Sequence, residues 1–240
     1  MGRANLNLAG KQLQLVKKLR QINKDVIVVY VNGKPIAEPW IDKNISGVVE
    51  SWESGTTAGT AVAEVLFGEV NPAGKLPLTF PRSVGQLQMI YNHKPSQYFH
   101  KYAFEKVTPL YPFGHGLSYS NFEYSEFEVN EIVNDKISIS VNLKNDSDID
   151  GEEVVQLYFR DSFSSVTRPV KELVRYSRVF VKAGETVSVD FDLEIKDLAF
   201  YDINMNYCVE EGEFEFMVGG SSDSKYLISE TLDIKKRYDF

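Results

Sequence analysis

Four glutamates stand close together in the first third of the chain: Glu50, Glu53, Glu64 and Glu69. Two carboxyl groups held near each other can share acid–base work, because one can donate a proton while the other withdraws one or attacks. Carboxylates on a solvated helix face are, however, the ordinary use of glutamate. Nothing in the linear sequence selects a pair from these four, so we expect surface residues and no catalytic pair.

A second group of side chains with binding chemistry lies between residues 82 and 109, in a long segment without periodicity. Loops of this length inside a compact domain are usually functional or belong to a partner surface. Aromatic rings stack on sugar rings, and imidazole and phenol groups hydrogen-bond hydroxyls. We therefore predict Tyr91, His93 and Tyr98 as substrate-binding residues, while a packed surface between domains stays open as the alternative. The aromatic and imidazole side chains that make up this predicted cluster are Tyr91, His93, Tyr98, Phe99 and Tyr102.

Three further motifs are incomplete. Gly114–Tyr119 falls one residue short of a dinucleotide fingerprint, because Tyr119 stands where the third glycine belongs. The serines at its end lack the flanking glycines of a nucleophilic serine. Asp146–Gly151 begins like a calcium loop, but Leu157 replaces the bidentate glutamate at its end, so a polar hairpin turn is expected. The three histidines are not spaced as metal ligands either. We expect no metal and no cofactor.

The totals exclude several classes of protein. The chain has 240 residues, a formal net charge of -8 and a pI near 5.0. This charge argues against nucleic acid as a partner, because phosphate binding needs clustered Lys and Arg. A single cysteine, Cys208, excludes an internal disulfide framework. No stretch reaches the roughly 18 to 20 apolar residues that span a bilayer, and no secretory signal begins the chain. We expect no membrane association, and the compartment stays open.

Helical and extended patterns alternate in the first half. Apolar residues recur at three-residue steps over 10–22, which is typical of a helix with one buried stripe. Residues 25–31 predict a strand buried on both faces. A second strand is predicted over 47–52, a second helix over 57–67 and an extended segment over 76–80. This order predicts an α/β fold with a mostly parallel sheet and flanking helices.

The periodicity changes after Tyr119. Apolar and polar residues then alternate, as in strands that bury one face, and turn signals separate the runs. The spacing predicts an all-β sandwich. We place the α/β domain at residues 1–118 and the sandwich at 119–240. The alternating sets are Ile137, Ile139, Val141 and Leu143; Val187, Val189, Phe191 and Leu193; and Phe214, Phe216 and Val218.

Three signatures occur in fixed order: Asn71–Pro81, Tyr91–Ser96 and Pro109–Ser120. Together they resemble the C-terminal half of a family 3 glycoside hydrolase, of the β-glucosidase and β-xylosidase type. Farther along, Asp150–Tyr158 and Glu211–Phe214 resemble the fibronectin type III-like domain, an Ig-like sandwich, that closes many of these enzymes. By this resemblance, residues 1–118 are part of the family's α/β sandwich domain.

The resemblance implies a retaining mechanism. An aspartate from a preceding barrel domain attacks the anomeric carbon, and a glutamate, often from the sandwich domain, protonates the leaving oxygen. This chain has no room for the barrel, and Arg3 matches an arginine that follows the region of that glutamate. No catalytic residue is therefore carried over.

We accordingly expect the C-terminal part of a retaining β-glycosidase that acts on terminal β-linked sugars. We expect it to be inactive alone or to need a barrel-bearing partner chain. A partial sheet would expose an apolar face, which predicts self-association or low solubility. Two alternatives stay open. One is a stand-alone carbohydrate-binding or adhesion module without hydrolysis, and the other is a complete small hydrolase that uses its own glutamates.

Overall fold

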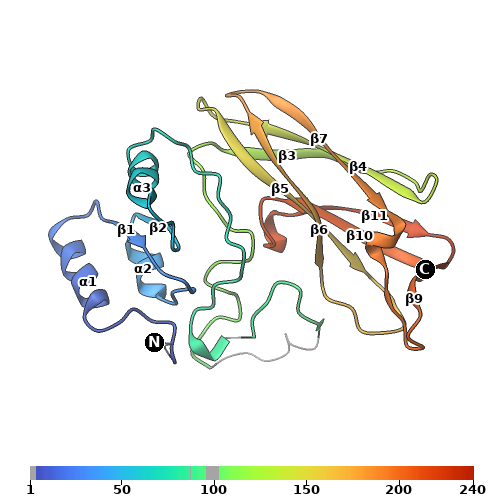
Figure 1. Ribbon diagram of the computed structural model, residues 1–240, viewed down its shortest axis with the longest axis horizontal. Helices are drawn as coiled ribbons and strands as arrows, with labels where there is room; N and C mark the ends of the chain where they lie inside the picture. The colour runs from blue at the N-terminus through green and yellow to red at the C-terminus, as the bar shows by residue number, and fades with distance from the viewer. Residues whose placement is uncertain (1–3, 87, 96–102) are drawn as a thin grey trace. The chain divides into compact units, whose positions relative to one another are not determined.

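The computed structural model describes residues 4–86, 88–95 and 103–240 (Figure 1). These residues form two compact units, and each unit is assembled from stretches that are separate in the sequence. The first unit takes in the chain up to Val70, Leu78–Met89 and the stretch that ends at Tyr111. The second takes in Asn71–Pro77, the stretch that begins at Ile90, and Pro112–Phe240.

A short parallel pair of strands forms the centre of the first unit. β1 (Ile27–Tyr30) and β2 (Gly47–Glu50) pair residue for residue along their whole length. The chain returns from one strand to the other through α2 (Pro39–Asn44), whose proline sits in the first helical turn, where an N–H would have no helical partner. The unit also contains α1 (Gln12–Ile22), α3 (Ala58–Leu66) and the 3₁₀ turn η1 (Val84–Gln86).

The prediction of a mostly parallel sheet is wrong. β1 and β2 pair in parallel, but the other sheets among the described residues are antiparallel. The segment at 76–80 does not add a parallel strand, because Phe80 makes a single antiparallel bridge to Tyr111. Pro77 and Pro81 remove backbone donors from this segment. A segment without those donors cannot extend a hydrogen-bonded ladder.

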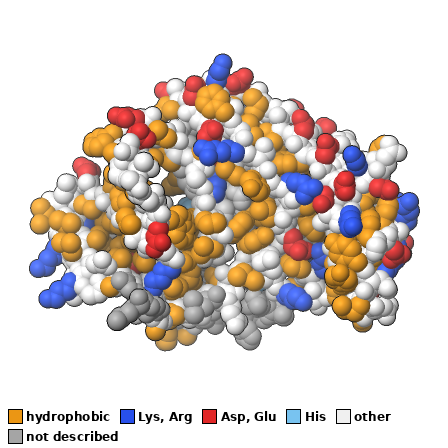
Figure 2. All heavy atoms as spheres, viewed as in Figure 1, with side chains coloured by type: hydrophobic (Ala, Val, Ile, Leu, Met, Phe, Trp, Pro, Cys, Tyr) orange, Lys and Arg blue, Asp and Glu red, His pale blue; other side chains and the backbone are white. Residues whose placement is uncertain are grey.

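The burial predicted for α1 and β1 is only partly correct. Leu13 and Val16 of α1 pack on a small core as expected, but Leu19 and Ile22 are 45% and 83% exposed. β1 is not buried on both faces, since Ile27 is 51% exposed. A two-stranded sheet has too little area to cover a helix along its whole length. Hydrophobic side chains therefore remain at the surface over α1 (Figure 2).

We expect this apolar surface on α1 to make the chain self-associate. Contiguous exposed apolar side chains mark association sites, and Leu15 is exposed there as well as Ile22. The double variant Leu15→Lys, Ile22→Lys should sediment as a smaller species than the wild-type chain at the same concentration. Val133→Lys is the matched control, since it removes an exposed apolar side chain from the second unit. A wild-type chain that is monomeric at high concentration would contradict the prediction.

The second unit is a sandwich of antiparallel sheets around one apolar core. One sheet has the strand order β11-β10-β5-β6 and the other β3-β4-β7, with a smaller sheet β12-β9-β8 (Figure 1). The strands are β3 (Phe122–Val129), β4 (Lys136–Asn145), β5 (Gly151–Asp161), β6 (Glu172–Val181), β7 (Thr186–Glu194), β8 (Phe200–Tyr201), β9 (Tyr207–Val209), β10 (Gly212–Gly219), β11 (Ile228–Ile234) and β12 (Tyr238–Asp239); short 3₁₀ turns lie at η3 (Ile195–Leu198) and η4 (Ser224–Tyr226).

The alternation predicted for these strands is confirmed. In β4 the four apolar residues from Ile137 to Leu143 are all buried, and the residues between them stay partly or fully exposed. β7 and β10 contribute their alternate side chains to the same core. A polar turn follows β4, where the Asn145 side chain donates to the Ile149 carbonyl and accepts from the Ser147 N–H. It is not the predicted hairpin turn, because β4 and β5 lie in different sheets. Among the residues described, no helix is long and apolar enough to cross a membrane.

Candidate functional site

The carboxyl ends of β1 and β2 meet at one edge of the first unit, and ligands of α/β folds bind outside such ends. Glu50, the last residue of β2, accepts hydrogen bonds from the Asn32 amide at 3.1 and 3.2 Å and from the Trp52 backbone N–H at 3.1 Å. Burial raises the pKa of Glu50, and these hydrogen bonds oppose the rise. Because Asn32 follows β1, the Glu50 carboxylate ties the two strand ends together.

Trp52 is held in an unusual backbone conformation. Its φ of 50° lies in the left-handed region, which is rare for a bulky residue and costs about 1–3 kcal/mol. Two contacts hold it there: the hydrogen bond to Glu50, and an edge-on ring contact with Phe80 at 5.9 Å between centroids. Strain of this kind concentrates at functional sites.

Glu53 lies at the same edge. Its Oε1 is 3.1 Å from the position that a Cβ on Gly33 would occupy, so the glycine lets this carboxylate approach the loop after β1. We call Asn32, Glu50, Trp52 and Glu53 the carboxylate corner. It offers carboxylate acceptors, an amide and an indole ring, which are groups that hydrogen-bond hydroxyls and stack on flat faces.

Two of the four glutamates singled out in the sequence lie in the carboxylate corner. Glu50 and Glu53 reach one edge, whereas Glu64 lies in α3 and Glu69 follows that helix. The expectation that these glutamates form no catalytic pair stays a prediction. Sequence reasoning missed Asn32 and Trp52. Asn32 follows the first predicted strand and Trp52 is the last residue of the second, so the rule about the carboxyl ends of parallel strands could have found both.

Two predicted binding residues lie in the second unit with protein partners. The Tyr91 ring stacks on Phe113 at 4.3 Å between centroids, and its hydroxyl accepts a hydrogen bond from the Leu173 N–H at 3.3 Å. His93 is 8% exposed, and its carbonyl accepts from the Val170 N–H at 3.0 Å. Burial lowers the pKa of His93. Their role in binding substrate stays a prediction, and Tyr98 lies outside the described residues.

The strongest sequence signatures come together in the second unit, where Asn71–Pro77 and Pro112–Ser120 form what we call the clasp. The Asn71 amide nitrogen donates to the Ser120 hydroxyl at 2.8 Å and to the Asp150 carbonyl at 3.0 Å. Its amide oxygen accepts from the Ser118 hydroxyl and the Tyr119 N–H, both at 2.8 Å. One side chain thus joins three separate stretches of chain.

A buried ion pair joins the clasp to β5. Lys75 Nζ is 2.8 Å from Glu153 Oε1, and the two side chains are 12% and 5% exposed. Lys75 also donates to the Gly116 carbonyl at 3.2 Å, and the Tyr124 hydroxyl donates to Glu153 at 3.3 Å. Burial raises the pKa of Glu153, while Lys75 opposes the rise. Lys75 therefore joins the glycine-rich signature at Gly116 to Glu153 of β5 by a hydrogen bond and an ion pair.

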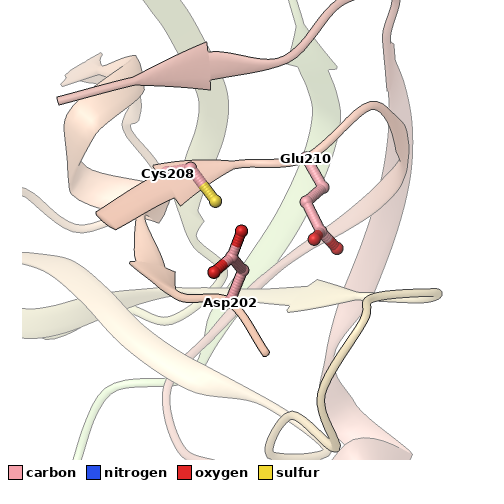
Figure 3. Close-up of side chains that lie close together, drawn as sticks. All are labelled: Asp202, Cys208 and Glu210. Carbon is pink, nitrogen blue, oxygen red and sulfur yellow. The ribbon is translucent and has the colours of Figure 1, made fainter. Parts of the chain in front are cut away.

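A third polar group lies between β8 and β9. Figure 3 shows the Cys208 sulfur and the Asp202 carboxylate pointing toward one another, with the Glu210 carboxylate beside them. Three such groups could hold a metal ion, but Arg237 already pairs with both carboxylates: its guanidinium is 2.7 Å from Asp202 and 3.7 Å from Glu210. Arg237 also lowers the pKa of Asp202 to about 2. We interpret the group as an ion network that ties the C-terminal strand β12 to β9.

We expect Arg237→Met to expose the Cys208 thiol in the folded chain. Without the guanidinium, two buried or partly buried carboxylates repel each other, and β12 loses its anchor beside β9. The rate of labelling of Cys208 by a thiol reagent under native conditions should rise, because this side chain is fully buried in the wild-type chain. Lys235→Met, which changes an exposed cation two residues away, should leave the rate unchanged.

Comparison with known families and curated relatives gives consistent matches. Residues 1–119 match the glycosyl hydrolase family 3 C-terminal domain, and residues 153–222 match the fibronectin type III-like domain. A β-xylosidase of Formosa agariphila is 40% identical over 97% of this chain, which covers 33% of that enzyme. Thermostable β-glucosidase B of Acetivibrio thermocellus is 37% identical over 98% of this chain, which covers 34% of it.

Solved structures agree with this assignment. A β-glucosidase from Erythrobacter marinus superposes with a TM-score of 0.91 at 38% identity, and 96% of this chain covers 31% of it. The β-glucosidase of Listeria innocua in complex with isofagomine gives 0.90 at 32% identity, with 97% of this chain and 34% of that one covered. The chain spans about a third of the length of the relatives it matches. It belongs to glycosyl hydrolase family 3, as a chain that carries the family's C-terminal domain followed by a fibronectin type III-like domain.

Proposed function

We propose that this chain is the C-terminal part of a retaining β-glycosidase that hydrolyses terminal β-linked sugars, and that the chain alone does not hydrolyse them. In this proposal, residues 1–118 are part of the α/β sandwich domain and residues 119–240 are the fibronectin type III-like domain. The observation that carries the proposal is how much of this chain, and how little of its relatives, the sequence matches cover. Relatives named β-xylosidase and β-glucosidase match nearly the whole chain, while the chain spans about a third of each.

The contacts of two carboxylates with raised pKa support inactivity. A retaining glycosidase needs one carboxylate free to attack and one acid free to protonate the leaving oxygen. Glu50 already accepts three hydrogen bonds, and Glu153 is paired with Lys75. Both carboxylates therefore serve the fold of their own unit. We propose that catalysis requires a barrel-bearing partner, which could be a separate chain or more of the same chain.

We expect no turnover of chromogenic β-glucoside or β-xyloside by the purified 240-residue chain. Turnover should appear when the remaining two thirds of a relative, such as the Acetivibrio thermocellus β-glucosidase, is supplied as a separate chain. That upstream piece alone is the control for its own activity. Turnover by the 240-residue chain that is lost in Glu50→Gln or Glu53→Gln would contradict the proposal and favour a complete small hydrolase.

The alternative, a carbohydrate-binding or adhesion module without hydrolysis, is favoured by one observation. Three aromatic rings lie together at the small sheet of the second unit, with 5.0 Å between the centroids of Tyr201 and Tyr207 and 6.3 Å between Tyr207 and Phe240. Tyr201 and Phe240 are exposed, and Tyr207 is partly buried. Such rings can stack on sugar faces. Retarded migration of the chain in gels that contain soluble β-glucan or xylan, lost in Tyr201→Ala, would favour this alternative.

A further inference from the structure

The connection between β5 and β6, residues 162–171, is fastened at several points in the second unit, and buried Lys171 at its end donates to the Ser222 carbonyl at 2.9 Å and to the Ser224 hydroxyl at 2.6 Å. The Ser162 N–H donates to the Glu213 carbonyl at 3.1 Å, and the Ser165 N–H donates to Glu210 Oε2 at 2.8 Å. Near its end, the Val170 N–H donates to the His93 carbonyl at 3.0 Å. This last hydrogen bond joins the connection to the segment that contains His93.

Asp161, at the end of β5, is a buried acid at the root of this connection. Its carboxylate lies beside the Phe163 N–H, while the Ser164 hydroxyl donates to the Val166 carbonyl at 2.8 Å. Asp161 is 6% exposed, yet its Oδ2 has no hydrogen-bond partner among the described residues. An ionised oxygen buried without a partner is costly, so this oxygen needs either a proton or a new donor.

A matching donor lies on the connection itself. Arg168 binds Glu172 at 2.6 Å through Nη2, and its guanidinium lies over the Phe200 ring at 4.4 Å. The Arg168 side chain is 9% exposed, and its Nη1 also has no hydrogen-bond partner among the described residues. Asp161 and Arg168 thus each hold one unused group of opposite kind, an acceptor oxygen and a donor N–H.

We propose that Asp161 and Arg168 form a proton-operated latch on the β5–β6 connection. When Asp161 carries a proton, Arg168 stays with Glu172 and the latch is open. When Asp161 releases its proton to solvent, the charged oxygen draws the unused Arg168 Nη1–H toward it, and the connection closes onto the end of β5. The segment that contains His93 then moves with Val170.

The charges around Asp161 place this change in mildly acidic solution. Burial raises the pKa of Asp161 to about 6, and the nearby Glu210 reinforces the rise, while Arg168 and the Phe163 N–H oppose it. Glu210 is itself close to Arg237. Because the pKa in the folded chain is raised, the stability contributed by neutral Asp161 is complete below its ordinary pKa of 3.8 and is lost as the pH rises through about 6. Closure of the latch offsets part of that loss.

An NMR titration of the whole chain between pH 4.5 and 8 tests the latch. The Ser164 amide and the Arg168 Nε–H should shift with one common midpoint near pH 6, and Asp161→Asn should abolish both transitions. Glu210→Gln should lower the midpoint by about half a pH unit to one unit, because a like charge is removed. Asp148→Asn, a change of an exposed aspartate in the same unit, should leave it in place.

Three results would overturn the proposal. The first is an Arg168 signal that stays constant across this pH range. The second is an Arg168 signal that titrates equally in the Asp161→Asn variant. The third is an Arg168 signal that follows Asp161 without any change in the Val170 amide. The first two would show that Arg168 does not respond to Asp161, and the third that the connection does not move. Asp161→Asn keeps the size of the side chain, and Glu210→Gln provides an independent readout if that variant does not fold.

Discussion

Lys75→Met should destabilise the second unit by about 3–5 kcal/mol, because it leaves the Glu153 carboxylate charged and buried without its cation. Both side chains are largely buried, at 12% and 5% exposure, so water cannot replace the lost partner. The single cysteine gives the readout. Cys208 is fully buried in the second unit, so its labelling in denaturant follows the unfolding of that unit.

Two further variants separate the ion pair from a general effect of losing a lysine. Adding Glu153→Gln to Lys75→Met should recover a large part of the stability, since the uncompensated charge is removed. Lys182→Met, which changes an exposed lysine in the same unit, should alter the unfolding free energy by less than about 0.5 kcal/mol. A loss below about 1 kcal/mol for Lys75→Met would show that the pair is worth no more than a surface salt bridge.

Gly116→Ala is expected to cost about 2–4 kcal/mol of the same unfolding free energy, through a backbone clash. A Cβ at this position would lie 2.2 Å from the Gly74 carbonyl oxygen, far closer than two such atoms can approach. The stretch around Gly74 would have to move away, and the Lys75 side chain would move with it. The clasp allows this approach because position 116 has no side chain.

A second glycine in the same unit provides the comparison. Gly184 has a φ of 72°, but nothing lies within 4 Å of the Cβ that an alanine would add. Gly184→Ala should therefore cost about 1 kcal/mol, from the left-handed backbone alone. Labelling of Cys208 in denaturant again measures both variants. Equal losses at the two positions would mean that the close approach at Gly116 contributes nothing.

The sandwich could be predicted from the sequence because its signal is local. Alternation from Ile137 to Leu143 defines a face within a single strand, and β4 buries the expected side chains. The sheet of the first unit could not be predicted in the same way. The pattern of residues 76–80 is extended, but whether an extended segment joins a sheet depends on which strand lies beside it, and here Phe80 makes only a single bridge, to Tyr111.

The candidate site shows a similar division. Glu50 and Glu53 could be named from the sequence as carboxylates near a strand end. Their partners could not, because the hydrogen bond from Asn32 joins positions 18 residues apart and depends on the parallel register. The positive φ of Trp52 has no signal in composition or periodicity. The sequence shows that Gly114 belongs to an incomplete dinucleotide fingerprint, but only the structure shows that this glycine packs closely on Gln156.

The order of stretches in the two units has a consequence at the level of the gene. Lys75 and Asn71 are encoded before the last stretch of the first unit, yet their partners Glu153 and Ser120 lie beyond it. Recombination at codon 118 would therefore produce chimaeras in which one parent supplies the lysine and the other its carboxylate. Exchange of the fibronectin type III-like domain between relatives should succeed when codons 71–77 come from the same parent as that domain. Shuffled libraries should be depleted of chimaeras in which codons 71–77 and the domain come from different parents.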